Sequence, residues 1–70
     1  MPTPKTSDIG LLIRDMIEDR EFDIYDLSGD EPEVVGKDEV SFVDVSDANN
    51  PVVTTVSGKR FVVRVIDVSC

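Results

Sequence analysis

One stretch of helical periodicity, followed only by strand-like patterns, narrows the folds open to this chain more than any other feature. Between residues 7 and 20, apolar side chains recur at spacings of three and four, which places them on one face of an α-helix. The members of this stripe are Ile9, Leu12, Ile13, Met16 and Ile17. Ser7 suits an N-cap and Asp8 suits the first turn. We therefore expect a helix over residues 7–20, preceded by an extended segment over residues 1–6.

Residues 21–68 carry the alternation and the β-branched runs that are typical of strands. Phe22 and Ile24 stand at alternate positions among acidic residues, and this pattern predicts a half-buried strand over residues 21–27. Turn-forming residues follow, and they predict that residues 28–39 are the most mobile loop.

Three further extended segments follow from the pattern of the second half. Residues 34–35 fit either a short strand or part of the loop, and residues 39–46 fit a strand. The β-branched runs 52–57 and 60–68 flank Gly58-Lys59 and predict a hairpin. The order of elements predicts an α+β fold, in which one N-terminal amphipathic helix packs on a small antiparallel sheet of about four strands, a meander ending in a C-terminal hairpin.

The length of the chain allows one domain, residues 1–70, with a small core. The single cysteine, Cys70, leaves no disulfide framework, which favours a reducing compartment inside a cell. We therefore expect a cytoplasmic protein, in the host cytoplasm if a phage encodes it. No N-terminal run is long and apolar enough for a signal peptide or a membrane span, so we expect no membrane partner.

Several chemistries lack their usual residues in this sequence. Histidine is absent, which removes the commonest general base and the commonest zinc ligand, and no glycine-rich phosphate loop occurs. The acids of residues 26–33 and 44–50 do not follow the spacing of a calcium loop. We therefore expect no enzyme activity, no cofactor and no metal site.

The net charge of −8 is concentrated in one part of the chain. Residues 15–47 hold thirteen acids against Arg20 and Lys37, which gives −11, whereas residues 1–14 carry +1 and residues 48–70 carry +2. Contacts with phosphate groups require an excess of lysine and arginine. Direct binding to nucleic acid or to an anionic membrane is therefore not expected.

The acidic block has two interpretations. It is either the solvated surface of a small domain or a concentrated negative surface that engages a basic site on a protein partner. In the second case it would compete for a groove lined with lysine and arginine on a nucleic-acid-handling protein, at a rate sensitive to salt. The candidate partner-binding residues are Asp15, Glu18, Asp19, Glu21, Asp23, Asp26, Asp30, Glu31 and Glu33.

The last predicted strand is apolar on both faces, because Phe61 and Val63 alternate with Val62 and, further along, with Ile66 and Val68. One helix covers one face of a sheet. The other face must be covered by curling of the sheet, by a second copy in a homodimer or by a protein partner. At the hairpin tip, Lys59 and Arg60 either keep the turn solvated or contact an acidic group.

At the level of class, the chain resembles the small acidic α+β proteins with which phages and mobile elements inhibit host nucleic-acid machinery, anti-CRISPR proteins among them. The resemblance rests on size, charge and the lack of catalytic residues, and it assigns no individual residue. It implies a non-catalytic inhibitor that mimics nucleic acid. The alternative is a structural or assembly protein, such as a small virion component, that oligomerises through its β-sheet face and edge.

Overall fold

The computed structural model describes residues 2–69. It contains one helix followed by a four-stranded antiparallel meander, in which each strand pairs with the next strand along the chain. The elements are α1 (Thr6–Ile17), β1 (Glu21–Asp26), β2 (Glu33–Asp44), β3 (Val52–Thr55) and β4 (Arg60–Val62). The predicted α+β architecture is confirmed. Cys70, on which the expectation about the compartment rests, lies outside the described residues.

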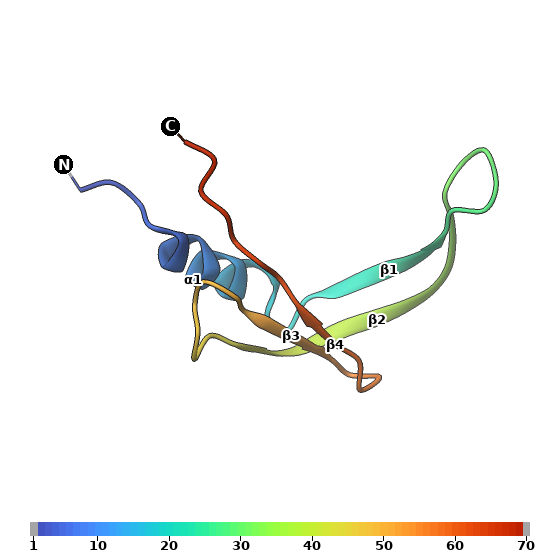
Figure 1. Cartoon of the computed structure of the whole chain (residues 1–70). Helices are drawn as coiled ribbons and strands as arrows, with labels where there is room; N and C mark the ends of the chain where they lie inside the picture. The colour runs from blue at the N-terminus through green and yellow to red at the C-terminus, as the bar shows by residue number, and fades with distance from the viewer. Residues whose placement is uncertain (1, 70) are drawn as a thin grey trace.

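The core lies at one end of the molecule, between α1 and the sheet formed by the second half of β2 with β3 and β4 (Figure 1). The buried hydrophobic residues among those described are Val40, Val43 and Val53, with Ile17 of α1 packed against them. Val40 pairs with Thr55 and Phe42 with Thr54, so Ser41 is an extra residue in β2. Because of this bulge, Val40 and Val43 reach the same face of the sheet although they are three residues apart.

Helix α1 begins and ends earlier than the sequence predicts. Its N-cap is Lys5 and not Ser7, and the Lys5 backbone N–H donates to the Asp8 carboxylate over 2.8 Å. The helix ends at Ile17 and not at residue 20, because the chain turns there to meet β2. Asp19, in the left-handed conformation with φ of 64°, donates its N–H to the Val40 carbonyl. This hydrogen bond between residues far apart in the sequence ends the helix before the apolar periodicity does.

Only one side of the apolar stripe of α1 packs against the rest of the protein. Gly10 is buried, and a Cβ at this position would lie 1.7 Å from the backbone oxygen of Ala48. Since the absence of a side chain lets the helix approach the 45–51 segment here, the side of α1 that carries Gly10, Ile13 and Ile17 turns inward. Ile9, Leu12 and Met16 remain exposed, so the expectation that the whole stripe is buried is wrong.

Strand β2 is longer than predicted, and the loop before it is shorter. Residues 33–38 form the first half of β2, paired with β1, where the sequence favoured a loop over residues 28–39. Gly36 does not break the strand, because Ile24 of β1 lies opposite it, and Lys37 forms ion pairs across the sheet. The pairing steps from Gly36 to Val34 against consecutive residues of β1, which makes Val35 a second bulge.

The C-terminal hairpin is confirmed, but its strands are shorter than expected. Gly58 has φ of 95°, the left-handed conformation that such a turn requires. Strand β3 ends at Thr55 and β4 at Val62, whereas the sequence predicted strands as far as residues 57 and 68. The segment after β4 continues with two backbone hydrogen bonds, from Val63 to the Pro51 carbonyl and from Val65 to the Asn49 carbonyl.

The molecule is long for its number of residues. Its radius of gyration is 14.5 Å, whereas about 11 Å is typical of a compact domain of this length. Figure 1 shows the reason: the hairpin of β1 and the first half of β2 projects away from α1, β3 and β4. We call residues 21–39 the hairpin arm and the remaining described elements the body.

Candidate functional site

The hairpin arm carries the densest charge of the chain. It holds eight acids and one base, Lys37, for a net charge of −7. These acids are Glu21, Asp23, Asp26, Asp30, Glu31, Glu33, Asp38 and Glu39. Because the arm projects from the body, its negative charge is presented to solvent on a narrow two-stranded support (Figure 1).

Lys37 compensates only part of this charge. Its ammonium lies 3.3 Å from the Glu21 carboxylate and 3.8 Å from that of Asp23. The hydrogen bond with Glu21, and then its charge, raise the pKa of Lys37. All three side chains are solvated, so these pairs contribute little to stability.

Two cross-strand positions of the arm bring like charges together. Glu21 lies opposite Glu39, and Asp26 lies opposite Glu33. Like charges directly opposite each other in an antiparallel pair are destabilising. At these two positions, the facing acids therefore destabilise the hairpin.

Two carboxylates of the arm have structural partners. Asp26 begins the loop at the tip: it accepts hydrogen bonds from the Ser28 hydroxyl (2.7 Å) and backbone N–H (2.9 Å), and these bonds lower the pKa of Asp26. Asp38 stands at the base and accepts from the Ser57 hydroxyl at 2.5 Å, which is the main cause of its lowered pKa. Asp38 thus fastens the arm to the loop between β3 and β4.

The structure divides the nine candidate residues into two groups. Six of them lie on the arm, namely Glu21, Asp23, Asp26, Asp30, Glu31 and Glu33. The other three lie at the end of α1. Asp15 pairs with its neighbour Arg14, and Glu18 accepts a hydrogen bond from the backbone N–H of Val43 over 3.0 Å. Since Glu18 satisfies an amide on the edge of β2, its carboxylate already has a structural role.

The arm also exposes apolar side chains that were not among the candidate residues. They are Phe22, Ile24, Tyr25, Leu27, Val34 and Val35. The alternation in β1 predicted that Phe22 and Ile24 would be half-buried, but no described element covers the arm. Their β-propensity was a usable signal of strand structure, whereas their exposure depends on the absence of a covering layer. The arm is therefore both acidic and apolar.

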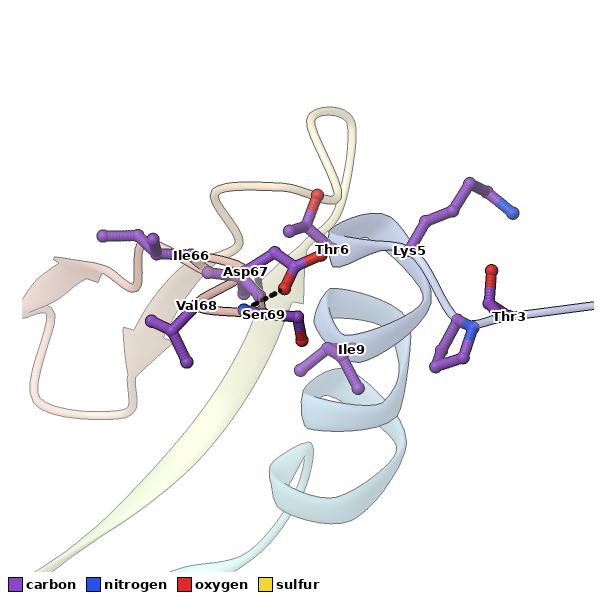
Figure 2. Close-up of a pocket in the computed structure, with 10 residues that line it drawn as sticks. Thr3, Lys5, Thr6, Ile9, Ile66, Asp67, Val68 and Ser69 are labelled. Carbon is purple, nitrogen blue, oxygen red and sulfur yellow. Dashed lines mark hydrogen bonds between the residues drawn. The ribbon is translucent and has the colours of Figure 1, made fainter.

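Two open hollows lie on the body. One, of 590 Å³, separates the N-terminal segment and the start of α1 from residues 65–69 (Figure 2). Asp67 lines it and accepts a hydrogen bond from the Ser69 N–H, which lowers the pKa of Asp67. The other, of 560 Å³, lies between α1 and β2 and includes Glu18. Arg14 also lines the second hollow, but the Glu18 carboxylate there already accepts the Val43 N–H.

Residues 2–69 contain neither a cluster of metal-ligating side chains nor a helix that could span a membrane. No group of three or more potential metal-ligating side chains converges there. The one helix of this part of the chain falls short of the length and apolar character needed to cross a membrane.

Comparison with known proteins returned no relative: no family matches the chain, and neither a curated protein nor a solved structure matches it significantly.

Proposed function

We propose that this chain is a small non-catalytic binding protein whose hairpin arm engages a basic, nucleic-acid-handling surface of a protein partner. The observation that carries the proposal is the gathering of eight acids and a single lysine on one projecting hairpin. Such a partner is inhibited when the arm occupies the surface that its nucleic acid needs. The proposal places this action in the cytoplasm, which is the host cytoplasm for a phage-encoded protein.

The charge spacing on the arm supports mimicry of nucleic acid. The paired strands of the arm carry six acids over the length of β1, which has six residues and spans about 20 Å. This corresponds to one charge per roughly 3 Å, against about 1.7 Å for duplex DNA. The arm therefore carries about half the charge density of the duplex, close to the one charge per about 3.4 Å of a single strand.

The like-charge pairs add a second argument. Each pair, Glu21 with Glu39 and Asp26 with Glu33, destabilises the hairpin. A basic partner surface would relieve this repulsion on binding, so that the complex gains what the free hairpin loses. Electrostatic attraction of this kind acts mainly on the association rate and weakens as salt rises.

The test compares the natural chain with a neutralised variant, Asp19→Asn, Asp23→Asn, Glu31→Gln and Glu33→Gln together. Asparagine tolerates the left-handed backbone of residue 19, so the fold is retained. Each protein is immobilised and exposed to lysate of the cells in which it acts, and captured proteins are identified by mass spectrometry. The expected result is a nucleic-acid-binding protein that the natural chain retains, that duplex DNA displaces, and that the variant loses.

A matched control is Lys59→Ala with Arg60→Ala, which removes two charges from the body hairpin and leaves the arm intact. Capture should persist in this control. If the neutralised variant captures the same protein as quickly and as tightly as the natural chain, the acids act only in solvation and the proposal fails.

A second candidate function, assembly, is favoured by a different observation. Sixteen large hydrophobic residues are exposed among those described, whereas only three valines form the buried core. Exposed apolar area on this scale is typical of a surface that another chain covers.

A further inference from the structure

We infer that the hairpin arm of one copy docks against the open edge of β4 in a second copy, and that the reciprocal contact closes a dimer. This inference goes beyond the binding of a basic partner, because it concerns the chain alone; since both contacts use the arm, a basic partner and the second copy compete for it.

The arm lacks a third strand and a covering layer. In the described structure, β3 pairs with β2 only from Val40 to Asp44, so the first half of β2 has β1 as its only neighbouring strand. An isolated two-stranded hairpin is marginally stable in water, and it needs another strand or a packed face. Phe22 and Ile24 stand on one face of the arm without cover, which marks the face that requires a partner.

The exposed area has the size of a dimer interface. The accessible surface is 5629 Å², whereas about 4300 Å² is typical of a compact monomer of this mass. The excess, on the order of 1300 Å² per chain, amounts to about 2600 Å² for two copies, which falls in the range of obligate dimers. A dimer that buries this excess would restore a normal exposed area.

The complementary surface is the open edge formed by β4 and the segment that follows it, residues 60–66. The N–H groups of Val63 and Val65 point inward to the carbonyls of Pro51 and Asn49. Because successive amides along an extended chain point in opposite directions, those of Arg64 and Ile66 face the open edge. Phe61 and Val62 are also exposed here, at 56% and 68%. A strand with free backbone groups and apolar side chains is a template for pairing with another chain.

Charge selects the pairing of arm with β4 edge over the alternatives. Residues 59–69 carry Lys59, Arg60 and Arg64 against Asp67, for a net charge of +2, whereas the arm carries −7. Two arms repel each other, and two β4 edges bring positive charges together. Arm against edge is the one attractive combination, and a two-fold axis allows both contacts to form at once.

The test uses two charge-reversed variants of the full chain. The edge variant is Arg60→Glu with Arg64→Glu, which changes the edge from +2 to −2, and the arm variant is Asp30→Lys, Glu31→Lys, Glu33→Lys and Glu39→Lys together, which changes the arm from −7 to +1. None of these four arm acids makes a side-chain hydrogen bond or ion pair with a described residue, and the reversals turn the like-charge pairs of the arm, Glu21 with Glu39 and Asp26 with Glu33, into opposite-charge pairs. Mass is measured by light scattering during size exclusion and by sedimentation, at about 10–100 µM chain.

The natural chain is expected to sediment as a dimer in low salt. Each variant alone is expected to dissociate about tenfold more readily or worse, because like charges now meet at both contacts. An equimolar mixture is expected to regain the dimer, because the arm of each variant then meets an edge of opposite sign. This recovery cannot come from a variant that fails to fold, so it separates loss of the interface from loss of structure.

Lys5→Glu is the matched control, since Figure 2 shows the Lys5 side chain pointing away from the segment that follows β4. It should leave the dimer intact. A natural chain that stays monomeric over this range overturns the inference, as does a dimer that neither variant weakens. Growth into polymers with rising concentration would overturn the closed reciprocal arrangement. All of these measurements use the purified chain without lysate, so their failure is distinct from failure of the partner-binding proposal.

Discussion

In the body, β2 is flanked by β3 and covered by α1, whereas in the hairpin arm the same strand pairs with β1 and has no described layer on either face. Val43 and Val35 show the difference most directly. Both are valines of β2, yet Val43 is 1% exposed and Val35 is 62% exposed. The comparison shows that burial in this protein follows from the layer packed on the strand and not from the hydrophobicity of the strand.

The largest difference in stability between the two regions is expected when a glycine of each is replaced by alanine. Gly10→Ala would place a Cβ 1.7 Å from the backbone oxygen of Ala48, so α1 must move away from the body. We expect a loss of about 3 kcal/mol or more, at the upper end for overpacking, which approaches the whole stability of a chain this small. Thermal unfolding followed by circular dichroism measures it.

Gly36→Ala in the arm is the control, because its Cβ would meet only the Ile24 side chain, at an ordinary contact distance of 3.9 Å. It should melt within a few degrees of the natural chain. Equal effects of the two substitutions would remove the distinction between a packed body and an open arm.

The next effect concerns the two valines of β2. Val43→Ala removes a fully buried side chain and should lower the free energy of unfolding by about 2 kcal/mol. Val35→Ala should change it by less than about 0.5 kcal/mol in dilute solution, as is usual at exposed positions. Urea titration measures both. A large loss for Val35→Ala at low concentration would mean that the arm is covered within the monomer.

A smaller contrast lies within α1 and tests the direction in which the helix faces. Ile17 packs against the three core valines, whereas Met16 is 59% exposed. Ile17→Ala should cost about 1–2 kcal/mol, because its side chain is only partly buried. Met16→Ala should cost less than about 0.5 kcal/mol. A larger loss of stability for Met16→Ala than for Ile17→Ala would mean that the Met16 side of the helix, and not the Ile17 side, faces the core.

The smallest expected effect on stability concerns the hydrogen bond between Asp38 and Ser57, which connects the arm to the body. The pKa of Asp38 is lowered by its hydrogen bond with Ser57, so the ionised carboxylate stabilises the folded state. This contribution is present above the ordinary pKa of 3.8 and is lost as pH falls through the lowered value. The melting temperature of Asp38→Asn should therefore lie below that of the natural chain near neutrality, and the gap should close in acid.

Ser57→Ala removes the same contact from the other side and should reproduce this pH dependence. A gap between the natural chain and Asp38→Asn that stays constant down to about pH 2.5 would show that the carboxylate charge is not involved.

Patterns among residues close in the sequence were sufficient to predict the elements that depend on local interactions. The spacing of Ile9, Ile13 and Ile17 predicted α1, and Gly58 between β-branched runs predicted the turn between β3 and β4. Contacts between distant residues decided the rest. The helix ends at Ile17 because Asp19 and Arg20 pair with Val40, a partner that periodicity does not reveal.

Long-range contacts also explain the other errors. Gly36 has the composition of a turn, but its pairing with Ile24 keeps it inside β2. The facing of α1 depends on the approach of Gly10 to Ala48, which no amphipathic pattern encodes. For the candidate site, composition was enough to find the acidic block. It did not distinguish Glu18, which binds the Val43 amide, from acids that have no structural partner.

Strand β2 has a mechanical consequence. Its 12 residues span about 40 Å, nearly the 44 Å length of the molecule. The tip of the arm and the valines of the core therefore belong to one continuous backbone, without an intervening linker. A load applied to the tip of the arm is transmitted along this strand to Val40 and Val43, so the position of the tip and the rigidity of the core are coupled through a single element.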